Sequence, residues 1–412
     1  MTPAGFAAHG VGGSTDLPIP FIYAMVGASW ALTISFAVLA LAWKTPRFAD
    51  DAEIVDPPPR RPWLAVVGLV LTAWVVGALF LGPDDASNGG LQGFYILVWV
   101  GLVPLALLGG HVWRDLSPWR TLTGRGVWVY PGRLGYWPAA VGLFAFVWLE
   151  LASPDPGSVT AVRTWIAVYA AVMVAGGVAF GPRWFDRADP FDVYSSLVAR
   201  LSPFVTAGRW NLHNPLRSLP TVPVAPGLVA VLAVLLGSTA YDSFAASPFW
   251  QSRTLSHLQH TATLLGFCIV VGTLFVAAAV ATGGVSRDRR RMLPGLLAHS
   301  LVSIVVGYIF AHYLTYLLEK GQGAFFALLD PLGRGWTPLG DPSTSFFLSE
   351  HTSTLAALKV AFVVAGHVVA VIAAHDRALV LLPKAHRLSG QLGMLLLMVA
   401  YTFTGLYLLF SV

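Results

Sequence analysis

The sequence predicts an all-α, polytopic integral membrane protein with about ten transmembrane helices, in a single transmembrane domain over residues 1–412. Hydrophobic residues make up 56% of the chain and charged residues only 11%, unlike a soluble globular domain. Apolar stretches of about 18 to 25 residues recur along the chain, and each is long enough to cross a hydrocarbon core about 30 Å thick as a helix. Basic residues gather in alternate loops, which is a topology signal.

The expected helices are apolar runs bounded by polar or Gly- and Pro-containing loops. In chain order they cover residues 20–43, 63–81, 94–112, 135–152, 162–181, 226–241, 257–281, 294–318, 353–375 and 388–410. The N-terminal stretch lacks the charged start of a signal peptide, so we expect the first run to remain as a helix.

The distribution of basic residues predicts the orientation. Of the 25 Lys and Arg residues, 20 lie in alternate loops, including "SRDRRRML" at residues 286–293. The opposite loops are poor in basic residues and contain "GPDDASNGG" and "SPDPGS". The positive-inside rule therefore predicts a cytoplasmic "SRDRRRML" loop and both termini outside, in agreement with an even number of crossings.

Two connections are long enough to carry structure of their own. Residues 190–205, within "DPFDVYSSLVARLSPFV", have apolar residues at helical spacing and predict an amphipathic helix at the membrane interface. Residues 319–352 mix Gly and Pro with aromatic residues. We expect this segment to form an outer, partly ordered cap loop, because loops of this length are usually functional or disordered.

Several histidines fall in three consecutive predicted helices, 257–281, 294–318 and 353–375. Because neighbouring helices run antiparallel, their depths can be matched about the helix midpoints at about 1.5 Å per residue. One set of histidines then lies towards the outer side. This outer group consists of His257, His260, His312 and His351, with Lys359, Asp242 and Glu319 as candidate neighbours.

A second set of histidines lies towards the cytoplasmic side. It contains His299, at the start of one helix, and the pair His367 and His375 in "GHVVAVIAAHDRAL". His111, which ends the third predicted helix, could join them if the packing allows. The stretch "GHVVAVIAAHDRAL" thus predicts the inner half of a two-level arrangement, with Asp376 and Arg377 at the water boundary.

Imidazoles at two levels predict haem b or a His-bound transition metal, since imidazole binds copper, iron and zinc and is an axial ligand of haem. The candidate haem ligands are His260, His312, His299, His367 and His375, and the candidate metal ligands are His257, His260, His312 and His351. His299 and His312 lie about 140° apart around an ideal helix and so face different neighbours. The alternative is that these histidines are hydrogen-bonded packing residues.

Two residues are candidates for proton transfer. Tyr308 shares a polar stripe with His312 and Tyr316, at i, i+4 and i+8 of one otherwise apolar helix. Lys359 lies deep in a predicted span, where a charge costs at least ~2.5 to 3.5 kcal/mol. We expect Lys359 to face the bundle interior near His260 and His312.

Other features exclude classes of function. A single cysteine, Cys268, excludes an intrachain disulfide and Cys-based metal sites. The sequence contains no Walker A loop, "HExxH" motif, Gly-x-Ser-x-Gly elbow or Rossmann fingerprint in its expected context. The net charge of +5 comes from short clusters between apolar runs, so it does not indicate binding to nucleic acid.

The Arg- and Trp-rich stretch "GGHVWRDLSPWRTLTGRG" favours anchoring at the membrane interface.

Four stretches carry a resemblance to a family. They are "VWRDLSPWRTL" (112–122), "TAYDSFAASPFW" (239–250), "AHSLVSIVVGYIFAHYLTYLLEKGQ" (298–322) and "GHVVAVIAAHDRAL" (366–379). Through them the chain resembles actinobacterial membrane proteins called fenitrothion hydrolases, along most of its length. The resemblance implies that His299, His312, His367 and His375 belong to the family's motif, and that the chain lies in an actinobacterial plasma membrane.

Three functions remain open from the sequence. The first is a redox subunit with His-bound haem b or metal, which works with other membrane or extracytoplasmic redox subunits and with quinone as a candidate partner. The second is a metal-dependent membrane hydrolase, with a metal-bound water among the outer histidines, Asp242 and Glu319. The third is a transporter or a non-catalytic assembly subunit. All three are multi-pass proteins of the plasma (inner) membrane that contact lipids and no nucleic acid.

Overall fold

The computed structural model describes residues 14–48, 60–206, 209–282, 284–340 and 343–410. In this part of the chain the fold is helical, apart from a hairpin of two short strands, β1 (Val205–Thr206) and β2 (Arg209–Trp210). The prediction of an all-α fold is confirmed. The described residues form two compact units, unit 1 within residues 60–211 and 313–350, and unit 2 within residues 14–48, 212–312 and 351–410. The assignment of the chain to a single domain stays a prediction.

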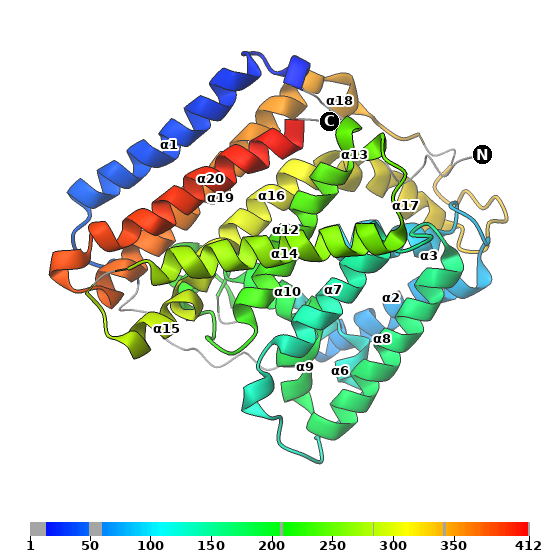
Figure 1. The fold of residues 1–412 in the computed structure, drawn as a ribbon. Helices are drawn as coiled ribbons and strands as arrows, with labels where there is room; N and C mark the ends of the chain where they lie inside the picture. Colours follow the sequence, from blue (N-terminus) through cyan, green and yellow to red (C-terminus); the bar gives the residue numbers. More distant parts are fainter. Residues whose placement is uncertain (1–13, 49–59, 207–208, 283, 341–342, 411–412) are drawn as a thin grey trace. The chain divides into compact units, whose positions relative to one another are not determined.

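In unit 1 the helices α2 and α8 are long, and the others that the structure describes are shorter (Figure 1). Its helices are α2 (Pro62–Leu81), α3 (Gly89–Gln92), η2 (Gly93–Val100), α4 (Leu102–Gly109), α5 (Val112–Leu116), α6 (Pro118–Leu122), η3 (Gly132–Leu134), α7 (Trp137–Leu151), α8 (Val159–Phe180), α9 (Pro182–Ala188), α10 (Pro190–Ala199), η6 (Tyr316–Lys320), α17 (Gly321–Leu329) and α18 (Phe347–Glu350). Gly110 ends α4 with φ 75° and Gly181 ends α8 with φ 64°, a backbone conformation that only glycine adopts readily. The chain therefore turns at once into α5 and α9.

Unit 2 is built of long helices, in which α12 packs against α14, and α1 packs against α19 and α20 (Figure 1). Its helices are η1 (Ser14–Asp16), α1 (Phe21–Ala42), α11 (Pro215–Ser218), η4 (Leu219–Thr221), α12 (Leu228–Ala245), α13 (Pro248–Gln251), α14 (His257–Val280), α15 (Arg287–Leu297), η5 (Ala298–Ser300), α16 (Leu301–Thr315, of which the last three residues belong to unit 1), α19 (Thr352–Leu381), η7 (Lys384–His386), η8 (Ser389–Gln391) and α20 (Leu392–Phe410).

A pair of glycines lets α16 and α19 approach closely in unit 2. A Cβ atom on Gly307 would lie 2.5 Å from the carbonyl oxygen of Phe362, and one on Gly366 would lie 2.6 Å from that of Ser303. One turn away, the rings of Phe310 and Phe362 stack with centroids 5.3 Å apart. The crossing fixes the register of the two helices that carry His312, His367 and His375.

The prediction of a multi-pass membrane protein is confirmed. Eight helices in the described ranges are long and apolar enough to cross a membrane, or nine if the bent pair Gly89–Val100 and Leu102–Gly109 forms one span. The pair is bent by 44° within the region where the sequence predicts a span over 94–112. The predicted span 135–152 is the 15-residue α7, about 22 Å long at 1.5 Å per residue and shorter than a hydrocarbon core.

The two long connections differ from what their composition indicates. The segment predicted as an amphipathic interfacial helix, 190–205, begins with α10, and eight of the ten residues of α10 are buried. The expectation of a surface helix is corrected here, because α4, α5, α7 and α9 all pack against α10. The predicted cap loop 319–352 is helical at its start, since η6 and α17 extend α15 and α16 into one helical run, Arg287–Leu329.

Candidate functional site

Three consecutive residues of α12 each direct a polar group at another helix of unit 2. The hydroxyl of Tyr241 lies 2.9 Å from Nδ1 of His260 on α14. The carboxylate of Asp242 lies 2.9 Å from Nε2 of His312 on α16. The hydroxyl of Ser243 lies 3.1 Å from Nδ1 of the same imidazole.

His312 is therefore held through both ring nitrogens. A carboxylate accepts and does not donate, so Nε2 of His312 carries the proton that it donates to Asp242. Nδ1 then accepts the hydroxyl proton of Ser243. These side chains are almost wholly enclosed, because Ser243 is 1% exposed, His312 4% and Asp242 8%.

The hydrogen bonds continue to Tyr308. Its hydroxyl lies 3.1 Å from Oγ of Ser243 and 3.3 Å from the carbonyl oxygen of Gly405 on α20, and its single proton is directed at one of these two oxygens at a time. Tyr308 and His312 are four residues apart on α16, and their rings are nearly parallel. We call the chain of Asp242, His312, Ser243 and Tyr308 the unit 2 relay.

The remaining members of the predicted outer group do not join His312. His257 and His351 are exposed, and His260 is half-buried between Tyr241 and the edge of the Trp250 ring. The carboxylate of Glu319, in unit 1, accepts the backbone N–H of Ser349 at 2.9 Å and also its hydroxyl. Among the residues that the structure describes, no group of three or more His, Cys, Asp or Glu side chains could hold a metal ion.

The predicted inner histidines do not meet: His299 is in η5, which packs against α19, and His367 is on α19. Nδ1 of His299 lies 3.2 Å from the carbonyl oxygen of Leu296, and Nδ1 of His367 lies 2.8 Å from that of Val363. Nε2 makes no hydrogen bond in either ring. The neighbours of His299 on α19 include Ala373, which is six residues, or about 9 Å, beyond His367.

His375 and Asp376 hold the segment that follows α1. The imidazole of His375 lies between the side-chain oxygen of Gln391, at 2.9 Å, and the carbonyl oxygen of Trp43, at 3.0 Å. Asp376 accepts hydrogen bonds from the indole of Trp43 and from the backbone N–H groups of Arg47 and Phe48. The polar end of "GHVVAVIAAHDRAL" thus attaches the segment after α1 to α19.

This arrangement does not fit a haem held by two facing imidazoles. His312 and His375 have both ring nitrogens engaged, and His299 and His367 lie at different levels of α19. The described part of the chain also contains no group of three or more His, Cys, Asp or Glu side chains that could bind a metal ion. We therefore derive no chemistry through either group.

Lys359 faces the interior of unit 2. It is 2% exposed, and its ammonium lies 5.9 Å from the centroid of the Phe410 ring. Its neighbours on the same face of α19, Ala356 and Val363, belong to the core cluster that contains Tyr308. The short helix η1 packs against α19, and the charge of its Asp16 acts on the lysine.

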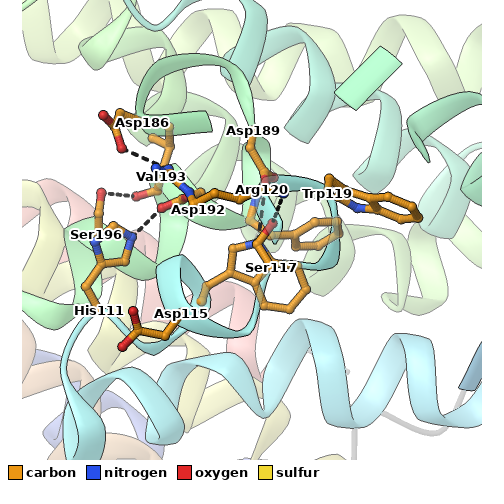
Figure 2. A network of polar contacts seen from close by, with 12 residues as sticks. His111, Asp115, Ser117, Trp119, Arg120, Asp186, Asp189, Asp192, Val193 and Ser196 are labelled. Atoms are coloured by element: carbon orange, nitrogen blue, oxygen red, sulfur yellow. Dashed lines mark hydrogen bonds and ion pairs between the residues drawn. The ribbon is translucent and has the colours of Figure 1, made fainter. Parts of the chain in front are cut away.

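Figure 2 shows a second buried polar cluster, which lies in unit 1. The Arg120 guanidinium donates through Nη2 to Asp186 at 2.8 Å and to Asp192 at 2.5 Å. His111 also pairs with Asp192. His111 thus lies in unit 1 and does not belong to the inner histidines, and we call this cluster of charged residues, with Asp189, the unit 1 network.

Asp189 and Asp192 lie one turn apart at the start of α10, and neither is accessible to solvent. Asp189 caps α10 by accepting the N–H of Phe191, and it also accepts hydrogen bonds from Tyr169 and Trp113. Burial, followed by the charge of Asp192, raises the pKa of Asp189. Burial alone would also raise the pKa of Asp192, but the charges of His111 and Arg120 more than offset it and lower that pKa. The paired Asp residues of "DPFD" were the signal available in the sequence.

Comparisons with protein-family models, curated proteins and solved structures found no match to the chain. The resemblance to fenitrothion hydrolases therefore stays a prediction, and any function has to be argued from the two buried clusters themselves.

Proposed function

We propose that the chain moves protons through unit 2 along the unit 2 relay, as a proton-coupled transporter of the plasma membrane. One observation carries the proposal: four polar side chains form an unbroken run of hydrogen bonds among apolar helices. Each buried polar group that lacks a partner costs roughly 1 to 3 kcal/mol, so packing alone rarely maintains such a run. Buried ionisable groups in membrane helices commonly belong to proton relays.

The four groups can pass a proton in one direction. Tyr308 gives its hydroxyl proton to Oγ of Ser243 as it receives another proton. Ser243 gives its own proton to Nδ1 of His312, and Nε2 gives a proton to the carboxylate of Asp242. Every intermediate group loses one proton and gains one, so the net change is one proton bound at Asp242. The hydroxyl groups and the imidazole then return to their first arrangement before the next transfer.

Proton flux into vesicles tests this proposal. The purified chain is reconstituted into liposomes that contain a pH-sensitive dye, and a potassium diffusion potential drives proton entry. We expect His312→Ala and Asp242→Asn to lower the protein-dependent flux at least about 100-fold, the usual contribution of a positioned acid or base. Ser243→Ala removes one hydroxyl with little change in volume and should also lower the flux.

His257→Ala is the matched control, because His257 is an exposed histidine of the same unit. It should leave the flux unchanged. The proposal is wrong if the wild-type protein gives no flux above that of empty liposomes, or if His257→Ala and His312→Ala lower the flux equally.

A second candidate is hydrolysis by Ser243. The order Asp242, His312, Ser243 is that of an acid, a base and a hydroxyl nucleophile in serine hydrolases, although the two ring nitrogens have exchanged their usual partners. This candidate would supply the nucleophile that the sequence alone did not reveal. Labelling of the wild-type protein, but not of Ser243→Ala, by a fluorophosphonate would support hydrolysis over proton transfer.

The redox function stays a prediction with its own test. A Soret band that sharpens on reduction of the purified protein would support haem, and a stoichiometric metal content would support a metal site. His367 is then the first residue to change, because its Nε2 is buried and makes no hydrogen bond.

A further inference from the structure

Three consecutive apolar side chains are exposed in unit 1, in the connection between α6 and η3. Val127 is 74% exposed, Trp128 66% and Val129 92%. A single exposed apolar side chain is ordinary, but a contiguous group of them indicates an interaction surface. We call residues 127–129 the apolar loop.

The apolar loop is held against the end of α8. The backbone N–H of Val127 donates to the carbonyl oxygen of Val178 at 3.3 Å, and that of Trp128 donates to the carbonyl oxygen of Ala179 at 2.7 Å. Both carbonyls belong to the last turn of α8, where a helix has no partners of its own for them. The indole of Trp128 also lies against the ring of Phe180, with centroids 6.2 Å apart.

A glycine allows this close approach. A Cβ atom on Gly126 would lie 2.2 Å from the carbonyl carbon of Phe180. On the other side of the loop, the buried Tyr130 donates its hydroxyl proton to the carbonyl oxygen of Gly135 at 2.8 Å. The exposed side chains are thus presented by a loop that is fixed at both ends.

The surroundings of the apolar loop indicate what covers it. Helix α8 is long and apolar enough to cross a membrane, so the loop that is bonded to its last turn lies where the span ends. Arg125 and Arg133 flank the loop and are exposed, and residues 116–149 contain no Asp or Glu. Tryptophan is enriched where a membrane meets water, and long basic side chains reach from that level to the headgroups. This combination matches a membrane surface.

The preceding stretch, "GGHVWRDLSPWRTLTGRG", contributes less to such an anchor than its composition indicates. Its Trp113 donates to Asp189, and its Arg120 is buried between Asp186 and Asp192. These side chains hold the unit 1 network together. The exposed apolar group begins directly after this stretch.

We propose that the apolar loop inserts into the boundary between the headgroups and the acyl chains of the membrane, and so anchors unit 1 beside the end of α8. The apolar side chains contact the first carbons of the acyl chains, and the flanking arginines lie at the level of the phosphates. The anchor does not rest on the unit 2 relay or on the proposed proton transfer.

A fluorescent label measures the depth of the loop. In a Cys268→Ser background, Val129→Cys is labelled with a nitrobenzoxadiazole maleimide, and the full-length protein is reconstituted into phospholipid liposomes. We expect the emission to shift towards the blue. A lipid with a nitroxide at the headgroup end of its acyl chain should quench most of the emission, and acrylamide on both sides of the membrane should quench little of it.

Two labelled positions in unit 1 calibrate the depth. Ser87→Cys lies exposed in the polar loop "GPDDASNGG", so acrylamide should quench its label and the lipid should not. Val168→Cys lies on the exposed face of α8, in the middle of the helix. Its label should be quenched best by a nitroxide at the far end of the acyl chain.

A charge in the loop tests whether the loop, and not the label, inserts. We expect Val129→Asp to make a label on Val127→Cys accessible to acrylamide, because a carboxylate disfavours contact with acyl chains. Circular dichroism verifies that the helices are retained.

The proposal is overturned if the label on Val129→Cys behaves like that on Ser87→Cys, because the loop then lies in water. It is also overturned if neither quencher reaches the label, since protein, such as a second copy of the chain, then covers the loop. Unchanged quenching at Val127→Cys when Val129→Asp is added would contradict it too, because the label alone would then enter the membrane.

Discussion

At the scale of single residues, the hydrogen-bond partners of each imidazole limit its chemistry. His312 and His375 have similar burial, yet His312 lies between a carboxylate and a hydroxyl, and His375 lies between two oxygen acceptors. The partners of His312 can accept and return a proton. The Trp43 carbonyl beside His375 cannot pass a proton on, so His375 is suited to holding a segment in place.

The buried charges of the unit 1 network give a prediction about stability. Asp192→Asn leaves Arg120 without its closest carboxylate and His111 without its partner. Breaking a buried ion pair costs about 3 to 5 kcal/mol, so we expect a marked loss of thermal stability in detergent at pH 7. Asp186→Asn, whose side chain is 36% exposed, should cost less than about 1 kcal/mol. Equal losses in the two variants would contradict a special role for Asp192.

The two buried aspartates should also have opposite effects on the pH dependence of stability. The pKa of Asp189 is raised, so the folded state keeps a proton that the unfolded chain releases near pH 4. The free energy of unfolding therefore falls as the pH rises from about 4 towards neutrality. The pKa of Asp192 is lowered, so its contribution is present above about pH 4 and is lost as the pH falls further.

Thermal unfolding of Asp189→Asn at a series of pH values measures the first effect. Asparagine also caps helices well, so the variant should fold. Its stability should change less than that of the wild type between about pH 4 and 7. A curve parallel to that of the wild type would show that another group causes the dependence.

At the scale of helices, hydropathy predicts the spans that are straight and apolar. The prediction of 20–43 matches α1 (Phe21–Ala42), and 257–281 matches α14 (His257–Val280). Prediction from hydropathy fails where a helix bends without a change in hydropathy, as at the bend after η2. It also fails where polar residues occur inside a helix. Helix α19 extends past Asp376 to Leu381, although Asp376 had indicated the water boundary.

The residues of the candidate sites could also be predicted from the sequence only in part. Tyr308 and His312 share a helix face by sequence spacing alone, so their proximity was predictable. Ser243 was not, because 65 and 69 residues separate it from its partners Tyr308 and His312. The unit 1 network was missed because His111, Arg120 and the aspartates lie near or in short helices that hydropathy treats as loops.

The crossing of α16 and α19 gives a prediction at this scale. Gly307→Ala would place its Cβ against the Phe362 carbonyl and push the helices apart, at a cost of roughly 1 to 3 kcal/mol. Because Tyr308 follows directly, we also expect a lower proton flux. A Cβ on Gly266 of α14 meets open space, so Gly266→Ala should be neutral or stabilise the helix by up to about 1 kcal/mol. Thermal unfolding compares the two variants, and similar midpoints would argue against a close crossing.

At the scale of the whole molecule, the number of crossings decides the relative sides of the termini. The eight long helices alone would leave both termini on one side, as would ten crossings. Nine crossings, with either the bent pair or α7 counted, would separate the termini. The bent pair and α7 are the elements that hydropathy and length describe least clearly, so the topology depends on them.

Cysteine labelling can determine the topology, because Cys268 is the only cysteine and is buried. In a Cys268→Ser background, we expect Ser87→Cys and Ser252→Cys to react with a membrane-impermeant maleimide added outside intact cells, and Asp288→Cys to react only after the cells are opened. Gly132→Cys and Gly157→Cys flank α7. The concentration of arginines before α7 predicts a protected Gly132→Cys and a reactive Gly157→Cys. If both react from the same side, α7 does not cross, and the prediction that both termini lie outside fails unless the bent pair also returns to the side from which it entered.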